Sequence, residues 1–369
     1  MACTMELKTL VSALLATATL AACGGQAAPA STPPGSVAAA SASAKPAASA
    51  SPAASASLGA SAGAAGSPAA KPAASGGTIV VSYSQATSGF APIYMAKDAG
   101  MFQKNGLDVD LKRVSGAAQV PALVANEIQI AGVGGTEVTN VNMQGGTLVM
   151  LATVDDYPTF SLYADKKYKS VTDLAGQSVG ITTAGSSTDA SAQLFLKHYN
   201  MLDKVKIVPS GSTVPGILAA MSKGLAAGIL SPPVTAQADK QGYVELVNGF
   251  KLGEPLNTAG FTVTRAYLKD NRDTILKFLK SYAEGWAYAA DPANKAAVLK
   301  SLQKYTETDE PTAEVGFDAS LPVWQGKKVP TVDPKGLANI LALSNDPKAK
   351  QAKPEDSYDN SYMEAAVKS

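Results

Sequence analysis

The residues best suited to chemistry lie at 180–189, a small and hydroxyl-rich stretch between a short apolar run and an amphipathic segment. This order predicts a strand, a loop and a helix N-terminus, with Ser186 or Ser187 as the N-cap. The first N–H groups of a helix lack intrahelical partners and carry the positive end of its dipole, so such a turn can hold an anion. The same residues also suit an ordinary helix cap, and the stretch alone leaves both interpretations open.

The chain has few residues that are suited to catalysis. Cys3 and Cys23 are the only cysteines, and both precede residue 24, which excludes thiol nucleophiles, disulfides and Cys-based metal sites further on. His198 is the only histidine, and helix geometry puts it roughly 15 Å or more from the serines at 186 and 187, too far for a Ser-His-Asp triad. We therefore expect no enzyme, no metal and no cofactor.

The charge balance is nearly even, with 31 Lys and Arg against 30 Asp and Glu. This balance gives no excess of positive charge that would favour binding to nucleic acid. We therefore expect no nucleic acid as a partner.

Alternating strand and helix patterns position the polar stretch. The expected strands are 78–83, 107–112, 128–133, 148–153, 159–164, 178–181, 205–208, 227–230, 244–247 and 259–264. The expected helices are 90–104, 118–126, 137–143, 188–198, 214–223, 234–240, 270–290 and 294–305, and prolines punctuate the rest. Such alternation predicts the α/β class, with mainly parallel sheets flanked by helices.

The N-terminal part differs in composition from the rest. Residues 1–22 have the apolar run of a signal peptide, and Leu20-Ala21-Ala22-Cys23-Gly24 resembles the lipobox of bacterial lipoproteins. The resemblance implies cleavage before Cys23 and its lipidation. Residues 24–77 are almost entirely Ala, Ser, Pro and Gly, so residues 23–77 are expected to be a lipidated cysteine followed by a disordered tether.

Three further stretches resemble the binding proteins for nitrate, sulfonates, taurine and thiamine precursors, the SsuA/THI5-like substrate-binding proteins of ABC transporters. Residues 90–109 resemble the helix after that family's first strand and the strand that follows. Residues 120–131 resemble its "ALxxGExDIA" pattern, and residues 171–180 resemble its "DLKGKxVG" pattern. Together with the layout of the chain, they cover about residues 78–265.

The resemblance implies a two-lobed type II periplasmic-binding-protein fold with two crossing hinge strands. Lobe 1 would hold residues 78–165 and 250–369, and lobe 2 residues 166–249. The chain would be a monomer, lipid-anchored on the outer face of the cell membrane. It would deliver a small organic or oxoanion ligand to an ABC permease and ATPase.

In open α/β sheets, ligands bind beyond the carboxyl ends of the strands. Four such ends are polar, small or aromatic: 84–90, 134–137, 184–189 and 231–233. With the family's site carried over by position, the expected ligand contacts are Gln85, Phe90, Gly135, Thr136, Tyr157, Ser186, Ser187, Thr188 and Ser231. Tyr94 is expected in the core.

Two departures from the family bear on the ligand. Residues 225–230 lack the family's acidic residue, and Ser231-Pro232-Pro233 replaces a bulky one, which implies a wider pocket. No Arg or Lys lies at the key turns, and Arg113 and Arg265 are the nearest bases for an anion. Two alternatives stay open: a tethered ligand sensor, and an enzyme like the pyrimidine synthases, which use a Cys-rich motif and histidine.

Overall fold

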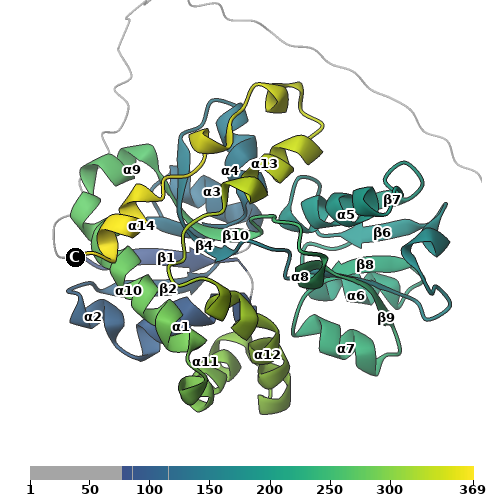
Figure 1. Cartoon of the computed structure of the whole chain (residues 1–369), viewed down its shortest axis with the longest axis horizontal. Helices are drawn as coiled ribbons and strands as arrows, with labels where there is room; N and C mark the ends of the chain where they lie inside the picture. The colour runs from purple at the N-terminus through teal and green to yellow at the C-terminus, as the bar shows by residue number, and fades with distance from the viewer. Residues whose placement is uncertain (1–76, 85, 115) are drawn as a thin grey trace, which may run out of the picture. The chain divides into compact units, whose positions relative to one another are not determined.

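The computed structural model describes residues 77–84, 86–114 and 116–369 (Figure 1). The predicted signal peptide, Cys23 and nearly all of the tether lie outside these residues, as does Gln85. Within this part, two five-stranded sheets are each flanked by helices. None of the helices described is both long and apolar enough to cross a bilayer.

The first sheet has the strand order β2-β1-β3-β10-β4. Its strands are β1 (Ile79–Tyr83), β2 (Val109–Arg113), β3 (Ile130–Val133), β4 (Leu148–Asp155) and β10 (Ala259–Thr264). β1 pairs in parallel with β2 and β3, whereas β10 is antiparallel to both β3 and β4. The carboxyl ends of β1 to β4 therefore share one edge, where β10 begins.

The second sheet has the order β7-β6-β8-β5-β9. Its strands are β5 (Ser161–Ala164), β6 (Ser178–Ile181), β7 (Lys206–Pro209), β8 (Ala227–Leu230) and β9 (Val244–Asn248). β5 is antiparallel to β8 and β9, and β6 is parallel to β7 and β8. The sequence boundary after residue 165 left β5 in lobe 1, whereas its hydrogen bonds lie in the second sheet. We call each sheet with its helices a lobe, and the chain crosses between them at 156–160 and 249–258.

Helices cover both faces of the first sheet (Figure 1). One face packs against α1 (Ala91–Asp98) and α10 (Arg272–Ala290) through a core rich in aromatic residues. The other face carries α3 (Gly116–Val124), α4 (Gly135–Met143) and α13 (Pro334–Leu343). The remaining helices of this lobe are α2 (Met101–Lys104), α9 (Arg265–Asp270), α11 (Lys295–Thr306), α12 (Glu310–Gly326) and α14 (Ser361–Ala366).

The second lobe carries α5 (Ser187–His198), α6 (Val214–Met221), α7 (Val234–Lys240) and α8 (Gly249–Leu252). Five short 3-10 helices complete the described elements: η1 (Ser88–Phe90), η2 (Val171–Leu174), η3 (Pro292–Asn294), η4 (Pro347–Lys350) and η5 (Pro354–Asp356).

Two helix predictions were wrong in detail. The single helix expected at 90–104 is split into α1 and α2, because Gly100 adopts a left-handed backbone with φ of 74°. The second is the tail: the chain was expected to be mostly helical from residue 266 but punctuated by prolines after 305, yet α12 extends without a break over 17 residues. Pro311 lies in its first turn, where a missing N–H costs nothing, and α12 also accommodates Pro322 in its interior.

Candidate functional site

Strand ends from both sheets meet at the two crossovers. The carboxyl ends of β3 and β4 lie on one side, and those of β6 and β8 lie on the other. We call the polar residues at these ends the junction site. Its members are Thr136, Glu137, Asp155, Ser187, Thr188 and Ser231.

The N-termini of α4 and α5 meet at Gly134. A Cβ atom placed on Gly134 would lie 2.2 Å from the Ser187 hydroxyl and 2.5 Å from Glu137 Oε2. The Ser187 hydroxyl donates a hydrogen bond of 2.9 Å to the carbonyl of Thr258, which joins α5 of the second lobe to the second crossover. The two helix starts and the crossover thus form one polar contact, in which residue 134 leaves no room for a side chain.

Glu137 places its carboxyl group between the two helix N-termini. Burial raises the pKa of Glu137 to about 7, opposed by its own N–H and by the N–H and hydroxyl of Ser187. Oε2 is buried without a hydrogen-bond partner in the part of the chain that the structure describes. A buried carboxyl group with an unsatisfied oxygen can accept a proton or a donor from a ligand.

Asp155 is the second under-satisfied acid. It ends β4, is 4% exposed, and receives one long hydrogen bond, 3.4 Å from Thr159 Oγ1. Burial raises its pKa to about 7, the charge of Asp156 adds to this, and the Thr159 bond opposes it. A Cβ on Gly89 would lie 2.6 Å from Asp155 Oδ2, so the carboxylate lies against the backbone of η1.

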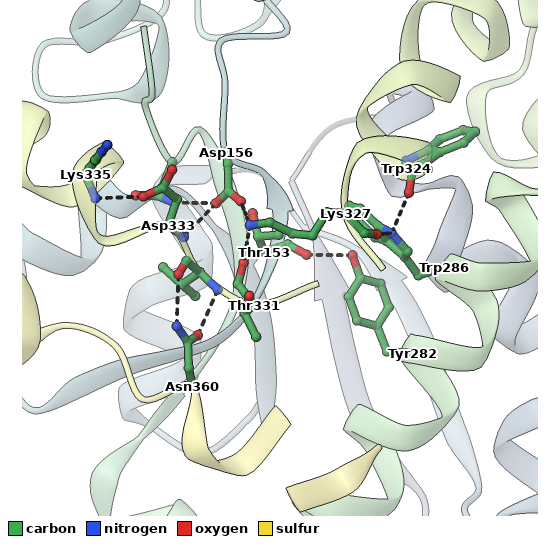
Figure 2. A network of polar contacts seen from close by, with 12 residues as sticks. Thr153, Asp156, Tyr282, Trp286, Trp324, Lys327, Thr331, Asp333, Lys335 and Asn360 are labelled. Carbon is green, nitrogen blue, oxygen red and sulfur yellow. Dashed lines mark hydrogen bonds and ion pairs between the residues drawn. The ribbon is translucent and has the colours of Figure 1, made fainter. Parts of the chain in front are cut away.

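Asp156, the next residue, has several hydrogen-bond and ion-pair partners (Figure 2). Its carboxylate pairs with the Lys327 ammonium and accepts hydrogen bonds from Asn257 Nδ2 at 2.7 Å and the Asp333 N–H at 3.1 Å. Lys327 also donates to the carbonyl of Thr331 at 2.6 Å. These bonds tie the first crossover to the second and to the segment between α12 and α13.

The structure confirms Ser186 as the N-cap of α5, since its hydroxyl accepts from the Asp189 N–H. The Ser186 hydroxyl also donates to the carbonyl of Thr183 at 2.7 Å. Thr188 accepts from the Thr182 N–H at 3.0 Å, and the hydroxyls of Thr182, Ser186 and Thr188 lie within 3.1 Å of one another. The predicted ligand contacts Ser186 and Thr188 therefore bond to their own loop in this structure.

The remaining predicted polar contacts differ in their availability. The Gly135 N–H donates to the carbonyl of Asn257 at 2.8 Å, and its Cα faces Leu337 and Ile340 of α13. Thr136 is 8% exposed, and its hydroxyl has no hydrogen-bond partner among the described residues. Ser231 is buried, and its carbonyl accepts the N–H of Val234 at the start of α7.

The predicted aromatic contacts lie in two different settings. Phe90 is buried and packs edge-on against Phe261 in the first-lobe core, where Tyr94 also lies, as expected. Tyr157 is half-buried in the first crossover, with its ring 6.0 Å from that of Phe250 in α8. Of the two predicted rings, Tyr157 is the one at the crossovers.

Neither of the two arginines considered for anion binding reaches the junction site. The Arg265 N–H bonds to the carbonyl of Thr147, before β4, so one strand length of roughly 25 Å separates it from Asp155. Arg113 ends β2 at the correct edge but is exposed, and two strand spacings, roughly 10 Å, separate β2 from β3. No Lys or Arg is among the fully buried residues of the described chain.

Two of the hollows in the described part bear on the position of the site. A space of about 10 Å³ lies between Ser88, the Pro232-Pro233 turn, and α11 and α12. A larger open groove of about 680 Å³ runs along α5 and β7 to residues 342–345. The smaller hollow contacts both lobes, at η1 and at the Pro232-Pro233 turn, but none of the junction-site residues lines it. We place the candidate site at the junction because of the buried polar groups there. In the same residues, no group of three or more His, Cys, Asp or Glu side chains could hold a metal ion.

Sequence reasoning included Glu137 within a strand end but did not select it, and it missed Asp155. Both could have been found from their positions at the edge where ligands bind: Glu137 is the first acidic residue after the buried strand β3, and Asp155 is the last residue of the buried strand β4. Their burial depends on the second crossover, which approaches this edge from a distant part of the sequence.

Known proteins were compared with this chain. The family model described as NMT1/THI5 like matches residues 87–296, more than half of the chain. "Putative binding protein YtlA" of Bacillus subtilis (strain 168) is 25% identical over 244 residues, 62% of this chain and 71% of YtlA.

Solved structures share the fold. The periplasmic aliphatic sulphonate binding protein SsuA of Escherichia coli superposes with a TM-score of 0.56 at 18% identity, over 66% of this chain and 83% of SsuA. The periplasmic nitrate-binding protein NrtA of Synechocystis PCC 6803 gives a TM-score of 0.60 at 14% identity, over 79% of this chain and 88% of NrtA. The fold is that of periplasmic binding proteins, and the chain belongs to the NMT1/THI5-like family.

Proposed function

We propose that this protein is the extracytoplasmic solute-binding component of an ABC importer. It captures a small ligand, organic or oxoanionic, of the nitrate, sulfonate or pyrimidine-like class, and delivers it to the permease and ATPase. The observation that carries the proposal is the gathering of buried, under-satisfied polar groups where the two lobes meet: the Thr136 hydroxyl, Glu137 Oε2 and the Asp155 carboxylate.

Unsatisfied buried polar groups cost stability, typically about 1–3 kcal/mol each. A ligand that supplies the missing hydrogen bonds recovers part of that cost and gains specificity at the same time. The two crossovers allow the lobes to separate for entry and to close over the ligand, excluding water. Binding and release need no covalent step.

The location of the protein in the cell is part of the same proposal. A lipid on Cys23 would anchor the protein to the outer face of the cell membrane, with residues 24–77 as a tether and the described part acting as a monomer. The relatives and solved neighbours named above are binding proteins by name, which supports a role without catalysis. His198 agrees with this role, because it lies on the exposed end of α5, 4.0 Å from Glu254.

The experiment is a thermal-shift screen of the purified protein against nitrate, sulfate, alkanesulfonates, carboxylates, amines and pyrimidines. A ligand at a hundred times its dissociation constant adds about 2.7 kcal/mol, enough to raise the melting temperature by a few degrees. For a ligand found in this way, Thr136→Val should weaken binding, because it removes the buried hydroxyl and keeps the side-chain shape.

Thr172→Val is the matched control, because Thr172 is exposed on η2 of the second lobe. A ligand whose affinity is the same in the wild type, Thr136→Val and Asp155→Asn would contradict the placement of the site. A folded protein that responds to none of the classes would contradict the proposed cargo.

A further inference from the structure

Two helix N-termini, one from each lobe, converge on a single carboxyl group. α4 begins at Gly135 and α5 at Ser187, and the carboxyl group of Glu137 lies between them. The N–H of Glu137 belongs to the first turn of α4, and the N–H and hydroxyl of Ser187 belong to the first turn of α5. The two N–H groups favour the ionised form of the Glu137 carboxyl. The Ser187 hydroxyl and Glu137 Oε2 both lie close to Gly134, but the hydroxyl donates its proton to the carbonyl of Thr258.

This position is where an anionic ligand would be expected to bind. Unpaired N–H groups and the positive ends of two helix dipoles attract negative charge, and a pair of them attracts it more strongly than one. In this protein the negative group is part of the chain. An incoming oxoanion would have to displace Glu137 or lie beside its carboxylate, where like charges repel strongly in a buried setting.

The other charges of the junction site have the same sign. Asp155 is buried with only the long bond from Thr159, and the Thr136 hydroxyl has no partner in the described chain. The Lys327 ammonium lies near this edge, but it is paired with Asp156 and donates to the Thr331 carbonyl. Arg113 is exposed, and four strand spacings, roughly 19 Å, separate β2 from β4. The site therefore offers hydrogen-bond acceptors and no buried positive charge.

We infer that the junction site selects a neutral or cationic ligand that donates hydrogen bonds, such as an amine, and that Glu137 excludes oxoanions by occupying the position they would take. This inference rests on the proposed function and restricts its cargo to organic ligands without an oxoanion group, which excludes the nitrate and sulfonate classes. Glu137 acts as a specificity-determining residue, and Asp155 is the acceptor for the donor groups of the ligand.

The test compares the wild type with Glu137→Ala and Glu137→Gln. Glu127→Ala is the matched control, because it removes the same charge from an exposed position in the same lobe. Each protein is titrated with sodium methanesulfonate or sodium sulfate, with sodium chloride at equal ionic strength as the reference, and the melting temperature is recorded. Circular dichroism checks that each variant is folded.

The wild type and Glu127→Ala should show no saturable rise in melting temperature beyond the chloride reference. Glu137→Ala should gain a saturable rise of a few degrees with methanesulfonate, because the two helix N-termini are then vacant. Glu137→Gln retains the shape of the side chain, so it should show a smaller gain and covers the case in which Glu137→Ala does not fold. Saturable oxoanion binding by the wild type, or no gain in either variant, overturns the inference.

A second arm tests the donor requirement on the wild type. Methylammonium chloride should raise the melting temperature saturably, whereas tetramethylammonium chloride, which has the same charge and no N–H, should not. Asp155→Asn should abolish the difference. Equal responses to both ions overturn the inference, while the proposed function is judged separately by the ligand screen.

Discussion

Asp155 and Asp156 are consecutive residues at the end of β4, and both are buried, yet their surroundings are opposite. Asp156 binds an ammonium group, a side-chain amide and a backbone N–H (Figure 2). Asp155 has one long hydrogen bond from Thr159 and lies against the backbone at Gly89. A strand that ends in two acids sends one side chain to each side, so one can stabilise the crossover while the other faces the junction.

This difference shows how buried acidic residues that stabilise the fold can be distinguished from those that serve a ligand site. Burial alone does not distinguish them, because both carboxyl groups are nearly inaccessible. Partners do distinguish them: a fully bonded buried carboxylate contributes to the fold, whereas an under-satisfied one carries a stability cost that a ligand can relieve. The predictions below test this contrast.

The largest effect is expected for Asp156→Ala, which leaves Lys327, Asn257 and the Asp333 N–H without their shared acceptor. We expect the free energy of unfolding to fall by about 3 kcal/mol, measured by urea denaturation at pH 7. Asp110→Ala is the control, because Asp110 forms a surface pair with Lys112 and should change stability by less than about 1 kcal/mol. Equal losses for the two variants would contradict a structural role for the Asp156 network.

Asp155→Asn should change stability in the opposite direction. The pKa of Asp155 is raised from 3.8 to about 7, so between roughly pH 4 and pH 7 the folded protein binds a proton that the unfolded chain has lost. The contribution of this residue to the free energy of unfolding therefore decreases as pH rises through that window and is constant above it.

Glu137, with its pKa raised to about 7, adds a decrease of the same sign. At pH 8 we expect Asp155→Asn to be more stable than the wild type by about 2 kcal/mol, with the difference vanishing below pH 4. Urea denaturation at a series of pH values measures it. A wild type whose stability rises between pH 5 and pH 7, with no effect of Asp155→Asn, would contradict the assigned burial.

Gly134→Ala should disturb the contact between the two lobes. The added methyl group would lie 2.2 Å from the Ser187 hydroxyl and 2.9 Å from the carbonyl of Thr258. Because the second of these atoms is backbone, we expect a loss of about 1–3 kcal/mol, seen as a lower melting temperature. Gly326→Ala is the control: a Cβ there meets nothing within 4 Å, so stability should hold or rise slightly.

The smallest effect is expected for Ser187→Ala, which removes the 2.9 Å bond to the Thr258 carbonyl between α5 and the second crossover. The loss should be about 1 kcal/mol, measured by urea denaturation. Ser187→Thr retains the hydroxyl and should recover most of it. A larger loss for Ser187→Thr than for Ser187→Ala would show that space, rather than the hydrogen bond, determines stability at this position.

The sequence was sufficient to predict elements whose patterns are local. Strands β6 and β8, the N-cap Ser186 and the start of α5 were each close to the expected positions, because apolar runs and capping residues act within a few positions. The α/β class followed from their alternation. The split at Gly100 was missed because a helical pattern does not show whether a glycine inside it will take a positive φ.

The junction site was less predictable for a physical reason. Whether the Ser186 hydroxyl faces a ligand or its own loop depends on side-chain geometry that spacing does not determine. The burial of Asp155 requires η1 and the second crossover, where Thr258, a hundred residues further along, donates its N–H to the carbonyl of Asp155 at 3.0 Å. The roles predicted for Gly135, Thr136, Tyr157 and Ser231 stay predictions.

The position of β10 in the first sheet has a consequence for the order in which the chain folds during synthesis. β10 lies between β3 and β4, so these two strands have no direct hydrogen bonds to each other and wait for a partner that begins at Ala259. The second sheet needs only residues 161–248, a continuous stretch. During synthesis, which proceeds from the N-terminus, the second lobe can therefore close its sheet first, while β3 and β4 remain as open edges. The pairing of β10 with β3 and β4 joins segments far apart in the sequence, the kind of contact that forms slowly in proteins generally.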